Sequence, residues 1–130
     1  MTVSIMVVED ESLVALDISE RLRSLGYEVP CMLSSGEDAI RHAGELKPAL
    51  VLMDIGLKGD MDGIEAASEI RAQFDIPVVF LTAYQDDKTF KRAAAAKPYG
   101  YIYKPFNDKD LRGCVEKAHL EVSMETESMK

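Results

Sequence analysis

The sequence predicts an α/β fold in which a doubly wound, parallel five-stranded sheet is covered by helices on both faces. Two observations predict it. Short apolar runs alternate five times with segments whose apolar residues recur at helical spacing. Three of the runs are nearly continuous in Val, Ile, Leu, Met and Phe, which is typical of strands covered on both faces. A (βα)5 chain of this kind is expected to have right-handed crossovers, and the strand order 2-1-3-4-5 is common for such sheets.

The individual elements follow from local signals. The strand candidates are residues 3–8, 28–33, 50–53, 78–81 and 100–103. The first helix ends at Gly26, the third opens on a capping box formed by Asp62 and Glu65, and Asn107 can cap the last helix. The helix candidates are residues 12–25, 36–46, 63–74 and 87–97, and a last helix that follows Asn107 and continues to Val122.

Length and composition fit one globular domain, since the chain has 130 residues, of which 47% are hydrophobic and 29% charged. We expect a domain over residues 1–122, followed at 123–130 by a C-terminal tail or the start of a linker helix, with a frayed tail favoured.

The net charge of −8 disfavours direct nucleic-acid binding, because no basic patch is present to neutralise phosphates. No segment suits membrane insertion and no signal peptide is evident, so a cytoplasmic location is expected.

Acidic residues, a hydroxyl and a lysine stand at the ends of four of the five strand candidates. Glu9 and Asp10 follow the first run, Asp54 the third, Thr82 the fourth and Lys104 the fifth. Because the carboxyl ends of parallel strands share one edge of a sheet, these side chains are expected to meet there. Strand-end acids are also common helix caps, which could explain one acid of the first group. Capping does not explain Asp54, which no helix follows directly.

This set of residues fits a divalent cation and a phosphoryl group. Three carboxylates held together repel one another, and a hard cation relieves the repulsion. Mg²⁺, with Mn²⁺ as an alternative, takes carboxylates, waters and substrate phosphate oxygens as ligands. The Thr82 hydroxyl and the backbone amide of Ala83 could donate to a phosphoryl oxygen, and Lys104 supplies a mobile positive charge.

The motifs VVEDE, LVLMDIGL, MDGIEAA, VVFLTA and GYIYKPF, in this order, resemble those of the receiver domains of bacterial and archaeal response regulators. The resemblance covers nearly the whole chain. It implies a flavodoxin-like fold and a function in two-component phosphorelay signalling. It also implies a signalling module rather than an enzyme, with self-catalysed phosphotransfer and a capacity for autodephosphorylation.

The resemblance assigns roles to the acidic residues. Asp54 is similar to the aspartate that accepts a phosphoryl group from a histidine kinase in a Mg²⁺-dependent reaction. Asp10 resembles the direct magnesium ligand, and Glu9 resembles the second acid, which binds mainly through water. The backbone carbonyl of Gly56 matches the third protein ligand.

The resemblance also implies a switch. Thr82 is similar to the hydroxyl that moves onto the phosphate, and Lys104 to the lysine that pairs with it. Tyr101 resembles the aromatic residue that turns inward when the hydroxyl moves, and Lys104-Pro105 resembles the family's cis peptide bond. The switched surface is the fourth helix, fifth strand and fifth helix. Its partner would be a downstream effector protein or an attached output domain, and a homodimer is left open.

Two departures from the family pattern stand near the acceptor. The loop from Asp54 to Asp62 is one residue longer than the commonest form. Gly56, two residues after Asp54, and Tyr84, two after Thr82, occupy positions that influence dephosphorylation in the family, so we expect an altered phosphoryl lifetime.

Other function classes fit less well. A pseudo-receiver used only for docking or dimerisation is the main alternative, although no member of the acceptor set is missing. A flavodoxin-like cofactor binder would need a phosphate cradle where Glu9 and Asp10 stand. A haloacid-dehalogenase-type phosphatase would need an aspartate in place of Gly56.

Overall fold

Strands and helices alternate without exception along residues 3–83 and 86–128, which are the residues described by this computed structural model. Glu9, Asp54, Thr82 and Lys104 each stand at or just after the last residue of a strand, in four of the five strands, as the apolar runs predicted. The strands are β1 (Ile5–Val8), β2 (Met32–Leu33), β3 (Leu50–Asp54), β4 (Val78–Thr82) and β5 (Gly100–Tyr103). The helices are α1 (Ser12–Ser24), α2 (Gly36–Leu46), α3 (Gly63–Phe74), α4 (Asp87–Ala95) and α5 (Asp108–Ser128).

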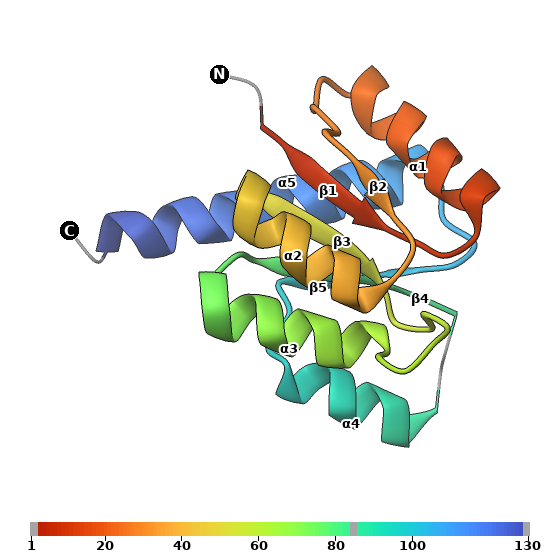
Figure 1. Cartoon of the computed structure of the whole chain (residues 1–130). Helices are drawn as coiled ribbons and strands as arrows, with labels where there is room; N and C mark the ends of the chain where they lie inside the picture. Colours follow the sequence, from red (N-terminus) through yellow and green to blue (C-terminus); the bar gives the residue numbers. More distant parts are fainter. Residues whose placement is uncertain (1–2, 84–85, 129–130) are drawn as a thin grey trace.

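The five strands form one parallel sheet in the order β2-β1-β3-β4-β5. The predicted fold class and strand order are therefore confirmed. Helices cover both faces of this sheet (Figure 1). One apolar core lies between the sheet and α2, α3 and α4, and the other lies between the sheet and α1 and α5. The central strands are buried along their whole length, as their continuous apolar sequence predicted.

The second strand is much shorter than predicted. Only Met32–Leu33 forms a strand, and Ser4 and Glu28 make an isolated parallel bridge upstream of it. Pro30 lies between the two paired stretches, and a proline has no N–H to donate to a neighbouring strand. The expectation of one strand over residues 28–33 is therefore wrong, although the segment does follow the edge of β1.

Other boundaries differ by a few residues. β1 begins at Ile5, two residues later than expected, and α4 ends at Ala95 rather than at residue 97. Lys97 has a left-handed backbone (φ 54°), which a helix cannot contain. The three local signals named from the sequence are confirmed: Gly26 has φ 98°, Asp62 and Glu65 form a capping box, and Asn107 accepts from the Asp110 amide at 2.8 Å.

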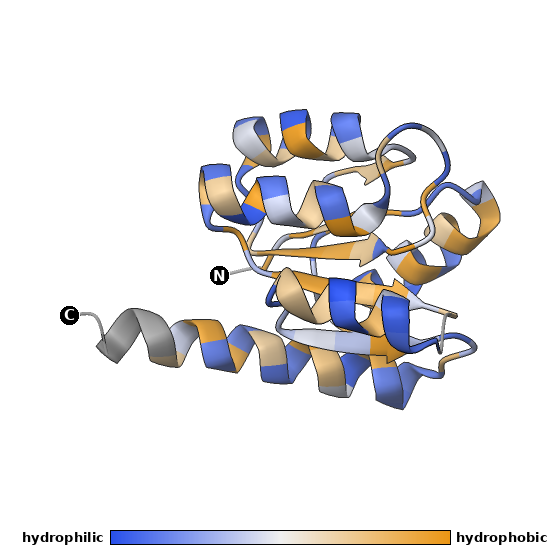
Figure 2. Cartoon of the chain, turned by 90° about the horizontal axis from the view of Figure 1, so that it is seen from below, coloured by the Kyte–Doolittle hydropathy of each residue, from blue (hydrophilic) through white to orange (hydrophobic). Residues whose placement is uncertain are grey.

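The last helix is longer than the predicted core helix. α5 has 21 residues, and its C-terminal part extends past the sheet (Figure 1). Residues 123–128 are helical, so the favoured frayed tail does not hold for them; residues 129–130 lie outside the described residues. Apolar and polar residues alternate along this helix (Figure 2), and Leu120 in its distal half is 60% exposed. Among the helices that the structure describes, none has both the length and the apolar character needed to cross a bilayer.

Candidate functional site

Strand register brings the predicted residues to one edge of the sheet. Val8 pairs with Met53, so Glu9 and Asp54 are the next residues of neighbouring strands. Asp54 pairs with Leu81, which directly precedes Thr82. Thr82 in turn pairs with Tyr103, which directly precedes Lys104. A parallel sheet with this order therefore places all of these residues at its carboxyl edge.

Three carboxylates gather at this edge. Glu9, Asp10 and Asp54 each offer an oxygen, and these oxygens all lie within 4.8 Å of one another. Glu9 is 2% exposed and Asp54 7% exposed, whereas Asp10 is half-buried. All three carboxylates are oxygen donors of the kind that a hard divalent cation prefers.

The ammonium of Lys104 enters the same cluster from β5. Its Nζ donates to Glu9 Oε1 at 2.6 Å and lies 3.6 Å from Asp54 Oδ2. The Lys104-Pro105 peptide bond is cis, as the resemblance implied. The backbone N–H of Lys104 donates to the Thr82 carbonyl at 2.9 Å, which ties the end of β5 to the end of β4.

Burial and crowding change the protonation behaviour of this cluster. Burial raises the pKa of Glu9, and its hydrogen bond with Asp54 adds to the rise, whereas Lys104 acts in the opposite direction. For Lys104, burial alone would lower the pKa, but the hydrogen bond to Glu9 and the charges of Asp54 and Glu9 outweigh it and raise the pKa. Three carboxylates share one ammonium, so the site carries excess negative charge that a cation would compensate.

Backbone amides hold the acids in place. The Gly56 N–H donates to Asp54 Oδ1 at 3.0 Å, and the Glu11 N–H donates to Glu9 Oε2 at 3.4 Å. The Lys58 N–H, in the loop between β3 and α3, donates to Asp10 Oδ2 at 3.0 Å. Sequence reasoning missed this last donor, because a main-chain N–H carries no residue signature. The only signal in the sequence is the extra residue of the loop.

The start of α3 is packed directly against the acceptor strand. The Gly63 N–H donates to the Ile55 carbonyl at 3.2 Å. A Cβ atom at Gly63 would lie 2.0 Å from the Asp54 carbonyl oxygen, a separation that no side chain tolerates. Glycine at this position therefore allows the close approach that fixes the loop after Asp54.

The predicted switch residues lie beside the acid cluster. Thr82 is 3% exposed, and Ala83 directly follows it and is exposed. The Tyr101 ring is half-buried and stacks between Phe90 of α4, at 5.5 Å, and Tyr103, at 6.3 Å. Thr82 and Tyr101 line the same small cavity. Tyr84, singled out from the sequence, lies outside the described residues.

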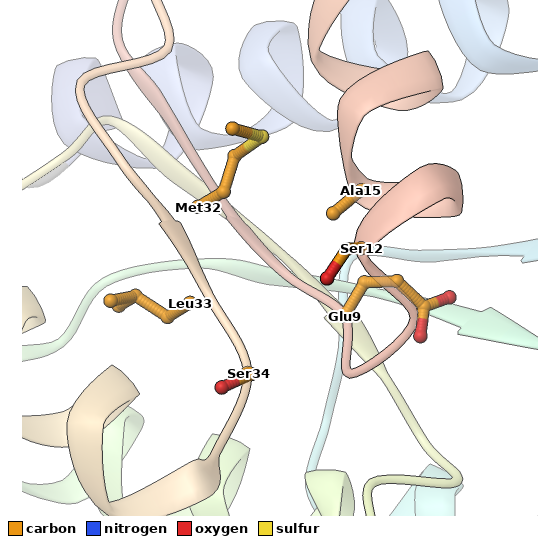
Figure 3. Close-up of a pocket in the computed structure, with 6 residues that line it drawn as sticks. All are labelled: Glu9, Ser12, Ala15, Met32, Leu33 and Ser34. Carbon is orange, nitrogen blue, oxygen red and sulfur yellow. The ribbon is translucent and has the colours of Figure 1, made fainter.

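Two larger hollows flank the acids. The first, of about 260 Å³, lies between β2 and the start of α1 and includes Glu9 and the hydroxyl-bearing Ser12 and Ser34 (Figure 3). The second, of about 270 Å³, lies between the β3–α3 loop and α4 and includes Gly56 and Arg92. Of the residues assigned to the site, Glu9 therefore lines the first hollow and Gly56 the second.

Comparison with known proteins gives the family. The model of the response regulator receiver domain matches residues 5–116. The chain belongs to this receiver family. It is 39% identical over 114 residues to the transcriptional regulatory protein PdtaR of Mycobacterium tuberculosis, and 40% identical over 119 residues to the response regulator protein VraR of Staphylococcus aureus. These alignments cover 88% and 90% of this chain but only 55% and 56% of the relatives, so the chain spans about half their length.

A solved receiver domain has the same fold. The signal receiver domain of a modulated diguanylate cyclase from Desulfovibrio desulfuricans superimposes with a TM-score of 0.91 and 37% identity, covering 96% of this chain and 99% of that one. The match covers almost the whole of that domain and agrees with the fold described above. Receiver domains of response regulators are components of two-component signalling, and this receiver has the acid cluster at the carboxyl edge of its sheet.

Proposed function

We propose that this receiver accepts a phosphoryl group on Asp54 from a phosphohistidine of a histidine kinase, in a reaction that requires Mg²⁺. The observation that carries the proposal is the position of Asp54. It lies within 4.8 Å of two further carboxylates and 3.6 Å from the Lys104 ammonium, and it is itself only 7% exposed.

The donor set fits a magnesium or manganese ion. Asp10 and Asp54 would bind it directly, the Gly56 carbonyl would supply a third ligand, and Glu9 would act through a water molecule. When bound, the ion neutralises charge on the oxygens of the transferring phosphoryl group. The excess of carboxylates over ammonium groups supports this assignment.

The transfer itself is carried by the chain's own residues. An Asp54 oxygen attacks the phosphorus in line, a new P–O bond forms, and the P–N bond to the donor imidazole breaks. The electron pair of that bond stays on the imidazole nitrogen, and the product on the receiver is an acyl phosphate. Lys104 pairs with a phosphoryl oxygen, and the Thr82 hydroxyl and the Ala83 amide donate to the others.

Phosphorylation then acts on the neighbouring surface. The new dianion attracts Thr82 and Lys104, and the space that Thr82 leaves lets Tyr101 turn inward. Tyr101 stacks on Phe90 of α4, so its movement changes the surface formed by α4, β5 and α5. That surface would bind an effector protein or an attached output domain. In the curated relatives the matched region is only 55% and 56% of the chain, which supports an attached output domain, and the proposal leaves a homodimer open.

Intact mass spectrometry with a small-molecule phosphodonor tests the proposal. We expect one phosphoryl group per chain with Mg²⁺ present, none with a chelator, and none in Asp54→Asn. Asp60→Asn is the matched control, since Asp60 is an exposed acid in the same loop. A phosphoryl adduct that persists in Asp54→Asn would refute the acceptor assignment. A wild-type chain that takes up no phosphoryl group would favour the docking pseudo-receiver.

A further inference from the structure

The β3–α3 loop reaches across the site to an acid of another strand. Glu9 and Asp54 each accept from the amide two residues further along the chain. Asp10 is held differently, because its Oδ2 accepts at 3.0 Å from the N–H of Lys58, which is 48 residues away. The position of the Asp10 carboxylate therefore depends on the shape of a loop that begins at Asp54.

The loop is built to hold that N–H in place. Ile55 and Leu57 are each 5% exposed and belong to the apolar core under α2 and α3. At the other end, Met61 packs against the same core. The exposed part between these anchors is short: Lys58, Gly59 and Asp60.

One residue of this exposed part has a backbone conformation that favours glycine. Gly59 has φ 105°, a conformation that glycine adopts readily and that residues with a side chain rarely adopt. The turn at Gly59 directly follows Lys58, whose N–H donates to Asp10. A proline at position 58 could not make this bond, because it has no N–H.

We infer that the main-chain N–H of Lys58 is a positioning group for the metal ligand Asp10, so that the β3–α3 loop, which directly follows the acceptor, sets magnesium affinity. The inference rests on the proposed function, because it treats Asp10 as a ligand. A carboxylate has about four lone-pair directions, so one hydrogen bond leaves capacity for a cation. Removing a hydrogen-bonding group that orients a metal ligand in this way typically weakens metal binding about 10- to 100-fold.

The test is calorimetric titration of the whole chain with Mg²⁺ alone, without a phosphodonor. Lys58→Pro removes the N–H and should weaken Mg²⁺ binding by about 10- to 100-fold. Lys58→Ala keeps the N–H, removes only an exposed side chain, and should bind Mg²⁺ like the wild type. Urea unfolding of each variant checks that it folds.

A second variant covers the case in which Lys58→Pro does not fold. Gly59→Ala keeps every donor but strains the turn, so it should displace the Lys58 amide and weaken Mg²⁺ binding less severely. Wild-type affinity in the folded Lys58→Pro or Gly59→Ala variants would overturn the inference. A large loss in Lys58→Ala would also overturn it, because the side chain would then be responsible. Failure of the wild-type chain to bind Mg²⁺ would instead refute the proposed function.

Discussion

Lys104 makes its shorter contact in the acid cluster with Glu9 and its longer one with the proposed acceptor. The two distances, 2.6 Å and 3.6 Å, place the ammonium beside both carboxylates. A phosphoryl dianion on Asp54 would carry more charge than the Glu9 carboxylate and would attract the ammonium away from it. Lys104 would thereby pair with Glu9 before phosphorylation and with the phosphoryl group afterwards.

This dual role leads to a prediction for Lys104→Ala. We expect phosphoryl uptake to persist, because Asp54 and the metal ligands remain, while the movement of Tyr101 is lost. Uptake is measured by intact mass, and movement by the NMR signals of the Tyr101 ring with and without phosphorylation. Lys109→Ala removes an exposed lysine at the start of α5 and serves as the control. A phosphorylation-dependent shift of Tyr101 in Lys104→Ala that equals the wild-type shift would contradict the assigned role.

At the scale of the elements, Asp62 joins two helices. Its side chain accepts from the Glu65 amide at 2.9 Å as the N-cap of α3, and it also pairs with Arg92 of α4 at 2.9 Å. The cap is a local feature that the sequence predicted. The ion pair with α4 is a tertiary contact between residues that are 30 positions apart, and no local pattern predicts it.

The two roles of Asp62 can be separated by mutation. Asp62→Ala removes both the cap and the ion pair, and should cost about 1–2 kcal/mol of unfolding free energy. Asp62→Asn keeps the cap and loses only the pair with Arg92, which is partly exposed, so it should cost less than about 1 kcal/mol. Arg92→Ala should match Asp62→Asn. Urea denaturation measures all three, and equal costs for Asp62→Asn and Asp62→Ala would contradict the capping role.

Sequence reasoning succeeded where short-range patterns decide the structure. Apolar runs ended by polar residues located Asp54 and Thr82 at strand ends, and the strand order is the one common for doubly wound sheets. Reasoning failed at the second strand, because an apolar run does not reveal that Pro30 interrupts the pairing. It also missed the bond from Lys58 to Asp10, which depends on how the loop folds back across the sheet edge.

At the scale of the whole molecule, the acid cluster is a source of instability that a cation would remove. Burial of the Glu9 carboxylate, and to a lesser degree its closeness to Asp54, raises the pKa of Glu9, so the ionised acid lowers the stability of the metal-free fold. A ligand that binds only the folded chain stabilises it by an amount that grows with ligand concentration. If the site binds a cation as proposed, its function and the stability of the domain are coupled.

Thermal unfolding measures this coupling. At about 100 times the dissociation constant, Mg²⁺ should add about 2.7 kcal/mol and raise Tm by several degrees. Asp10→Asn should have a higher Tm than the wild type without metal, because one repelling charge is gone, and a smaller increase on adding Mg²⁺. The Asn amide oxygen can still accept from Lys58, so the loop contact is preserved. A wild-type Tm that does not respond to Mg²⁺ would contradict the metal assignment.

The central claim is that the carboxyl edge of the sheet makes Asp54 the residue that carries phosphate. The most direct measurement traps the phosphorylated chain by borohydride reduction and locates the modified residue by peptide mass spectrometry. We predict the modification at Asp54 alone, and only in samples that contained Mg²⁺. Modification of Glu9, Asp10 or any other residue in place of Asp54 would contradict the account.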